Sequence, residues 1–252
     1  MMTERAKTVL LVDDNRTFVM YAGLLLKRMG YEVIPTGSAF EAIKLLKMMS
    51  PDALILDVNM PEMDGPSLLR QIKSDEEIAD IPVIMASADG SEKTLQECRR
   101  LGCSGYVLKP LTPESLHRCL QDALTPEGAE KRRHFRVAFE GRVSVRNSGQ
   151  TQELYAVNLS QGGIYIRKKD PLPVGTVVTI RFAAGDHIDV SLDGVVIYKK
   201  DIYDGAFKMV PGMAIQFKGL SAEKGDQLKA FINDLLTRDL LEEQDELVIS
   251  IC

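Results

Sequence analysis

The first half of the chain alternates short apolar runs with segments in which apolar residues recur every three or four positions. Runs of four or five apolar residues between turn-forming residues are typical of strands that a parallel sheet buries on both faces. The spacing of Phe18, Ala22, Leu25 and Met29 on one face is typical of an amphipathic helix. The pattern predicts five strands, at residues 8–12, 31–35, 53–56, 81–86 and 105–108. It predicts helices over residues 18–29, 38–50, 66–73 and 91–101, and a fifth that begins at Thr112.

Strands that alternate with helices in this way predict an α/β domain with a doubly wound, parallel five-stranded sheet. Such a sheet delivers the last residue of every strand to the same edge, where open α/β sheets bind their ligands. Polar residues stand at or just after four of these strand ends: Asp13, Asp14, Asp57, Ser87 and Lys109. We therefore expect their side chains to gather in one site.

The chemistry of these residues is complementary. Three carboxylates offer the hard oxygen ligands that Mg²⁺ prefers, and a carboxylate can act as a nucleophile that forms an aspartyl phosphate. The Lys109 ammonium could hold one phosphoryl oxygen, and the Ser87 hydroxyl could donate to another. Each residue alone has an ordinary explanation as a solvated loop end or a surface charge. Their shared position at one sheet edge favours a phosphoryl-transfer site.

Residues 8 to about 124 resemble the receiver domain of two-component response regulators. The resemblance rests on VDD at 12–14, DVNMPEMDG at 57–65, MASA at 85–88 and GYVLKP at 105–110. It implies a flavodoxin-like fold in which Asp57 accepts the phosphoryl group and Lys109 contacts it. It also implies a Mg²⁺ site formed by Asp13, Asp14, Asp57 and the Asn59 carbonyl. It implies a switch pair, made of the Ser87 hydroxyl and the rotating Tyr106 ring. Finally, it implies that the peptide bond between Lys109 and Pro110 is cis.

The helical pattern gives way after residue 125 to short strand-like runs punctuated by glycine and proline. Strands are predicted over residues 137–145, 153–159, 163–167, 176–182, 187–198 and 213–217. Closely spaced strands of this kind predict a small antiparallel β-barrel. A C-terminal amphipathic helix is predicted over residues 221–238, with Leu228, Phe231, Ile232 and Leu235 on its inner side. The predicted boundaries are 1–124 for the first domain, 125–131 for a linker, 132–238 for the second domain and 239–252 for a tail.

Two polar segments of the second half carry candidate chemistry. The basic run from Lys131 to Arg136 contains three arginines, whose forks can grip phosphate or read guanine edges. The segment from Asn158 to Gly163 is a polar turn in which small residues let a ligand approach the backbone. Taken separately, the first could be a solvated linker or a weak nucleic-acid contact, and the second an ordinary hairpin.

Together these segments resemble the PilZ domain, which binds the bacterial second messenger cyclic di-GMP, over about residues 130–238. The RxxxR signature stands at Arg132–Arg136, and the [DN]xSxxG signature begins 22 positions after Arg136, at Asn158. The resemblance implies that the arginines hold the phosphates and guanines of an intercalated nucleotide dimer, while the turn meets the bases. The implied binding residues are Arg132, Arg133, Arg136, Asn158, Ser160, Gly162 and Gly163.

Composition restricts the class of partner. A formal net charge of −5 argues against bulk electrostatic binding of DNA or of an anionic membrane. No apolar run approaches the roughly 20 residues of a spanning helix, and the first residues lack the apolar core of a signal peptide. The four cysteines show no CxxC spacing. We therefore expect a cytoplasmic protein with reduced thiols and no membrane insertion.

These observations predict a bacterial response regulator with no enzymatic output. A sensor histidine kinase would phosphorylate Asp57, and cyclic di-GMP would bind the second domain to control an unknown protein target in motility, surface or biofilm behaviour. The arginines stand between the two domains, so the two inputs should be coupled. One alternative is a protein-interaction module whose barrel binds no nucleotide. Another is a nucleic-acid binder that uses Lys131–Arg136. The sequence leaves open whether the protein forms a homodimer.

Overall fold

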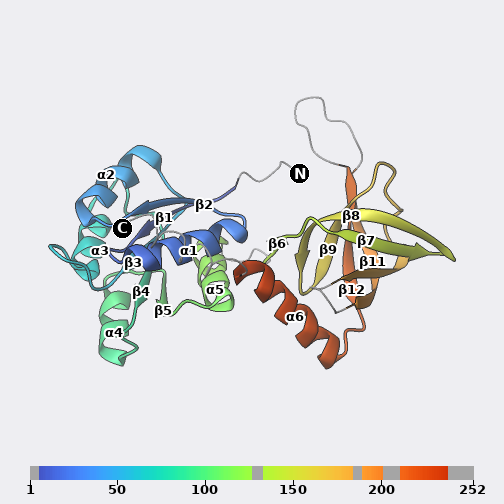
Figure 1. Ribbon diagram of the computed structural model, residues 1–252. Coiled ribbons are helices and arrows are strands. Elements are labelled where there is room, and N and C mark those ends of the chain that lie inside the picture. The colour runs from blue at the N-terminus through green and yellow to red at the C-terminus, as the bar shows by residue number, and fades with distance from the viewer. Residues whose placement is uncertain (1–5, 127–132, 184–188, 201–210, 238–252) are drawn as a thin grey trace, which may run out of the picture. The chain divides into compact units, whose positions relative to one another are not determined.

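The computed structural model describes residues 6–126, 133–183, 189–200 and 211–237. The chain divides into two compact units, Met1–Arg133 and His134–Cys252 (Figure 1). Among the helices in these described ranges, none is long and apolar enough to cross a membrane.

The first unit is built on a parallel five-stranded sheet in the order β2-β1-β3-β4-β5. Its strands are β1 (Thr8–Val12), β2 (Glu32–Thr36), β3 (Ala53–Asp57), β4 (Val83–Ser87) and β5 (Gly105–Leu108). Every residue of β3 and β4 is buried, because helices cover both faces of the sheet. The predicted flavodoxin-like sheet is confirmed.

Five helices cover the two faces of this sheet, with α1 and α5 on one face and α2, α3 and α4 on the other (Figure 1). They are α1 (Arg16–Arg28), α2 (Ala39–Met49), α3 (Gly65–Ser74), α4 (Glu92–Arg100) and α5 (Pro113–Leu124). Each begins after a polar residue whose side chain accepts a hydrogen bond from a backbone amide three positions on. These caps place the helix starts close to the strand ends that carry the polar residues.

The second unit is a closed antiparallel barrel. Its strands are β7 (Arg142–Asn147), β8 (Gln150–Ser160), β9 (Gly163–Arg167), β10 (Val177–Ala183), β11 (Asp189–Lys200) and β12 (Gly212–Lys218). They run in the order β8-β7-β10-β11-β12-β9, and pairing of β9 with β8 closes the ring. A two-residue strand, β6 (Val137–Ala138), adds to β8. The predicted small barrel is confirmed.

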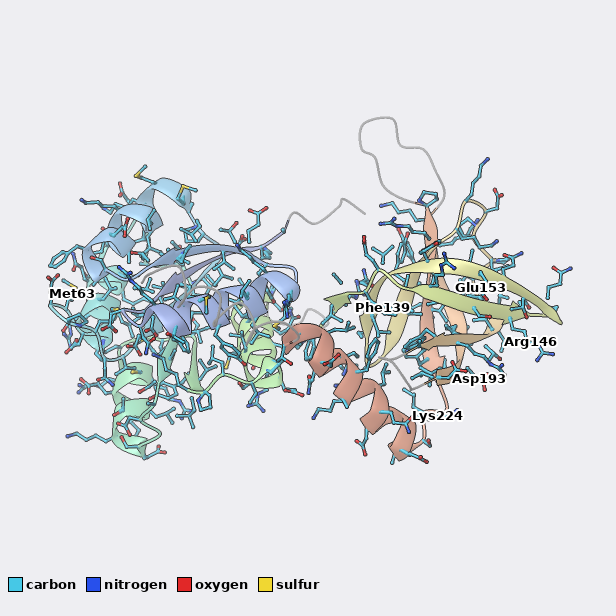
Figure 2. All side chains as sticks on the ribbon, viewed as in Figure 1. Met63, Phe139, Arg146, Glu153, Asp193 and Lys224 are labelled. Carbon is cyan, nitrogen blue, oxygen red and sulfur yellow. The ribbon has the colours of Figure 1, made fainter. Side chains whose placement is uncertain are left out.

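The C-terminal helix α6 (Ala222–Thr237) packs its apolar side onto the barrel. Phe231 meets the ring of Phe139 edge-on, with ring centroids 5.5 Å apart, and the ring of Phe182 at 6.1 Å. Phe139, labelled in Figure 2, therefore links the segment after β6 to α6. On the same helix Leu236 is buried, whereas the predicted Leu235 is only half-buried.

The strand predicted over residues 137–145 is wrong as a single element, because it is divided into β6 and β7. The break falls at Phe139–Gly141, where a Cβ on Gly141 would lie 2.6 Å from the Phe139 ring. The ring thus lies back against Gly141, and a larger residue at this position would have to displace it. Alternating hydrophobicity alone does not reveal this turn.

Candidate functional site

Three charged side chains from three different strand ends of the first unit are in direct contact. Lys109, which follows β5, donates to Asp13 Oδ2 at 2.5 Å and to Asp57 Oδ1 at 2.7 Å. The carboxylate side chains of Asp13 and Asp57 are only 1% and 7% exposed. Because burial excludes most of the screening water, these interactions are stronger than surface ion pairs.

The proton affinities of this cluster reflect both burial and pairing. Burial raises the pKa of the Asp57 carboxyl; the hydrogen bond from Lys109 opposes this rise and the charge of Asp13 adds to it. Burial acts to lower the pKa of Lys109, but hydrogen bonds to Asp13 and Asp57 outweigh it, so that pKa is raised. Lys109 therefore stays cationic, and additional positive charge beside Asp57 would favour its ionised form.

A divalent cation fits the donor set at this sheet edge. Carboxylate oxygens of Asp13, Asp14 and Asp57 all lie within 4.8 Å of one another. Asp14 is exposed, so the group opens to solvent, which suits Mg²⁺ because this ion keeps several waters. The backbone amide of Asn59 donates to the Asp57 carboxylate. The role of the Asn59 carbonyl as a metal ligand stays a prediction.

Gly65 forms part of the backbone floor beneath Asp57. A Cβ at Gly65 would lie 2.2 Å from the Asp57 carbonyl oxygen and 2.9 Å from Val58 Cα. The Gly65 amide also donates to the Val58 carbonyl at 2.9 Å. The first turn of α3 thus packs directly on the end of β3, which only glycine permits. This explains physically why the segment after Asp57 ends in glycine.

The two predicted switch residues are linked through Asp89. Ser87 is fully buried, and its Oγ accepts a hydrogen bond from the Asp89 amide at 3.0 Å. The Tyr106 hydroxyl donates to the Asp89 carbonyl at 2.5 Å. A displacement of the Ser87 side chain would therefore be transmitted to Tyr106 through its contacts with Asp89. Their switching roles stay predictions, whereas the cis peptide bond between Lys109 and Pro110 is confirmed.

Phe18 occupies a place that the sequence did not predict. Helical spacing placed it on the apolar core face of the first helix, but it is only half-buried. Its ring lies over Lys109, with the ammonium nitrogen 4.2 Å from the ring centroid. Phe18 is therefore part of the charged site.

In the second unit, strand pairing brings the residues that follow Arg136 beside the segment that leads into the polar turn. β6 pairs with β8 so that Val137 lies opposite Leu159 and Ala138 opposite Asn158. Arg136 is exposed and directly precedes Val137, so its backbone lies near the end of β8 that leads into the turn. Of the three predicted arginines, only Arg136 is placed beside the turn, since Arg132 lies outside the described residues and Arg133 ends the first unit.

The two glycines of the turn have different surroundings. A Cβ at Gly163 would lie 2.4 Å from the Ile215 carbonyl oxygen of β12, so close strand packing is sufficient reason for glycine there. A Cβ at Gly162 would meet only the His134 ring, at 3.2 Å. Ser160 Oγ donates to the Gly163 carbonyl at 3.1 Å. The turn is thus held by its own contacts, and nucleotide binding by these residues stays a prediction.

The sequence patterns did not single out two tyrosines that lie beside this turn. Tyr165 pairs with Asn158 on one side and with Ala214 on the other, and Ala214 pairs with Tyr198. These four residues form one row across the outer face of the barrel. Burial raises the pKa of Tyr165, and the nearby Tyr198 adds to the rise. Alternation could have placed Tyr165 outside, but Tyr198 faces outward only because β11 carries a bulge at Val196/Tyr198.

Comparison with known proteins agrees with both halves. The family profile "Response regulator receiver domain" matches residues 9–121, and "PilZ domain" matches residues 130–234. The polar-differentiation response regulator DivK of Brucella ovis is 34% identical over 106 residues, which cover 42% of this chain and 86% of DivK. The chain belongs to the response regulator family. It joins a receiver domain to a PilZ domain, as the sequence predicted.

Two further likenesses cover the receiver alone. DivK of Brucella anthropi is 32% identical over 106 residues, or 42% of this chain and 86% of that protein. The solved structure of the chemotaxis protein CheY4 of Vibrio cholerae is 30% identical, with a TM-score of 0.45, and the match covers 47% of this chain and 99% of CheY4.

Proposed function

We propose that this response regulator has two inputs: phosphorylation of Asp57 by a sensor histidine kinase, and binding of cyclic di-GMP by the PilZ domain. The observation that carries the first input is the buried contact of Lys109 with Asp57 and Asp13, at 2.7 and 2.5 Å. The ammonium of Lys109 thus lies beside the carboxylate proposed to attack phosphorus.

In this mechanism an Asp57 carboxylate oxygen attacks the phosphorus of the donor. The bond to the donor's leaving nitrogen breaks with its electron pair, and that nitrogen takes up a proton. Lys109 holds a phosphoryl oxygen while charge spreads over the transferring group. A Mg²⁺ ion held by Asp13, Asp14 and Asp57 would supply further neutralisation of those oxygens. Ser87 would donate its hydroxyl to the product and so transmit the change to Tyr106.

Support for the second input comes from the pairing of β6 with β8, which brings Val137, the residue after Arg136, opposite Leu159 next to Ser160. An arginine fork there can bind a phosphate or a guanine edge, while Asn158 offers an amide to a base. Tyr165 and Tyr198 add aromatic surface to the same row, which suits stacking of a nucleobase. The proposed domain limits stay at 1–124, 125–131, 132–238 and 239–252.

The output is proposed to be a change in binding to a downstream protein rather than a reaction, since both domains are regulatory. Cytoplasmic location, the identity of the target and a homodimer belong to the same proposal. The runner-up is an interaction module whose barrel docks to its target without nucleotide. The experiments on the two inputs separate these versions.

The first input is tested by incubating the protein with acetyl phosphate and Mg²⁺ and detecting the acyl phosphate on phosphate-affinity gels. Wild type and the control Asp80→Asn should be modified, and Asp57→Asn should not, because the attacking oxygen is gone. Equal modification of Asp57→Asn would place the phosphoryl group elsewhere and refute the assignment.

The second input is tested by calorimetric titration with cyclic di-GMP. Removing Arg132 and Arg136 together should weaken binding by about 100-fold or more, since each charge-assisted hydrogen bond contributes about 1.5–3 kcal/mol. Arg146→Ala is the matched control, because this exposed arginine projects from β7 outside the motif (Figure 2). Binding of one nucleotide rather than a dimer would discard the intercalated mode. No binding in any phosphorylation state would favour the runner-up.

Coupling between the inputs must be reciprocal if it exists. Phosphorylation of Asp57 should change the affinity for cyclic di-GMP by about 5- to 150-fold, the typical range of allosteric coupling. The titration is therefore repeated with the phosphorylated protein. Identical affinity in both states would refute the linkage while leaving each input intact.

A further inference from the structure

The Lys109 ammonium has three recorded partners in the described structure. Two are the carboxylates of Asp13 and Asp57, at 2.5 and 2.7 Å. The third is the ring of Phe18, whose centroid is 4.2 Å from the nitrogen. A cation at this distance over an aromatic face is attracted by the negative face of the ring. Unlike a third acid, the ring holds the ammonium without neutralising its charge.

The backbone at Phe18 is held by the same site. The Asp13 Oδ1 atom accepts a hydrogen bond from the Asn15 amide at 2.9 Å. Asn15 is the N-cap of α1, and its side-chain oxygen accepts from the Phe18 amide at 3.1 Å. Lys109 then returns to the other oxygen of Asp13. Asp13, Asn15, Phe18 and Lys109 thus form a closed ring of contacts, in which the cap of α1 fixes the backbone that carries the aromatic ring.

Holding a lysine matters because its ammonium sits on a long flexible stem with little directional preference. Both carboxylates that orient Lys109 in this structure are also the proposed ligands of a cation. Once the phosphoryl group and its counter-ion engage them, Phe18 is the partner of Lys109 that does not exchange. We propose that Phe18 is the positioning residue that keeps Lys109 aimed at the phosphoryl group on Asp57. This inference rests on the proposed phosphorylation.

Two reactions at Asp57 test the proposal because both need Lys109. In phosphorylation the Asp57 oxygen attacks phosphorus and the donor leaves with its electron pair. In hydrolysis a water oxygen attacks phosphorus, the bond from phosphorus to the Asp57 oxygen breaks, and Asp57 leaves as a carboxylate. The proton of the water passes to the released phosphate or to solvent. Both transition states spread charge over the equatorial phosphoryl oxygens. A positioning residue therefore speeds both reactions, whereas a mere water shield would slow hydrolysis.

The decisive comparison is Phe18→Leu against Phe18→Tyr. Leucine keeps an apolar cover but no aromatic face, and tyrosine keeps the face. With acetyl phosphate as donor, Phe18→Leu should slow both phosphorylation and hydrolysis of the acyl phosphate by about two- to fivefold, the range expected from one partly exposed cation–π contact. Phe18→Tyr should stay close to wild type. Val19→Ala, the next residue of α1, serves as the control for disturbance of the helix.

An NMR measurement reports the contact independently of the reaction. The ε-methylene protons of Lys109 should be shifted upfield by the ring in wild type and Phe18→Tyr, and should move downfield in Phe18→Leu. Unchanged rates in Phe18→Leu, faster hydrolysis, or equal slowing in Phe18→Tyr would each overturn the inference alone. Failure of wild type itself to form an acyl phosphate would instead overturn the proposed first input, and the inference with it.

Discussion

The two candidate sites of this chain are built in opposite ways. In the receiver domain the reacting groups are buried and charged, and sheet topology joins Asp13 to Lys109 across 96 positions of sequence. In the PilZ domain the described candidates are more open: Arg136 is exposed just before β6, and Asn158 faces outward from β8. There the turn is held by short-range contacts such as that of Ser160 with Gly163.

The difference teaches what each site can do. Buried charges of both signs that already touch are preorganised for chemistry, because little rearrangement is needed when charge develops. Arg136 is exposed and Asn158 is only half-buried, and ordering such side chains on binding reduces the net affinity for a given contact area. This difference agrees with the two proposed roles, a reaction on phosphorus at the first site and recognition of a nucleotide at the second.

The comparison is sharpened most by metal binding, which should affect only the buried acidic site. With Mg²⁺ at 100 times its dissociation constant, the free energy of unfolding should rise by about 2.7 kcal/mol, because the ion binds the folded state alone. Urea titrations of the receiver transition, with and without Mg²⁺, measure this gain. Asp13→Asn should lose most of it, and Asp226→Asn on α6 should keep it. A full gain in Asp13→Asn would mean that the ion binds elsewhere.

A smaller effect tests whether the glycines of the PilZ turn serve the fold or the ligand. Gly163→Ala would force a Cβ against the Ile215 carbonyl and should lower the free energy of unfolding by about 1–3 kcal/mol. Gly162→Ala should cost less, because only the His134 ring must move. Chemical denaturation without nucleotide compares the two. Equal stability of both variants would show that the barrel tolerates a side chain at the strand contact.

The smallest expected effect is the pH dependence of stability due to Asp57. Its folded-state pKa is raised above the ordinary value of 3.8, chiefly by burial. The Asp57 carboxyl therefore contributes most to the free energy of unfolding below pH 3.8, and this contribution is lost as pH rises through the folded-state pKa. Without Mg²⁺, Asp57→Asn should be slightly more stable than wild type at neutral pH, and this advantage should vanish on acidification. The gain is small because Lys109 loses a charged partner. A variant less stable than wild type at neutral pH would contradict the sign.

Much of the receiver site could be predicted from sequence because topology determines it. Once the strands are recognised as parallel, Asp57 and Lys109 must meet at one edge. The position of Phe18 could not be predicted in this way. Its spacing matches the core face of α1, whereas its ring lies over Lys109, a residue 91 positions away in the sequence that only the folded chain brings near.

The barrel was predictable in kind but not in register. Strand alternation predicts Ile164 and Ile166 inside and Tyr165 outside, as observed. Bulges in β8 and β11 shift the alternation, so the outward face of Tyr198 and the partner of Asn158 follow from the paired backbones alone. A bulge depends on contacts between strands distant in sequence, and no local pattern encodes it.

Because β6 is short, hydrogen–deuterium exchange of its backbone amides should report whether the barrel has bound a nucleotide. Val137 and Ala138 pair with β8, and the Phe139 amide adds one hydrogen bond to the Val157 carbonyl at 3.0 Å. So short a ladder opens readily, and its amides should exchange with deuterium soon after mixing. A nucleotide that contacts both Arg136 and the turn would stabilise the pairing of β6 with β8. Slowed exchange at these few amides would then count how many molecules in a sample carry the messenger, without any label on the ligand.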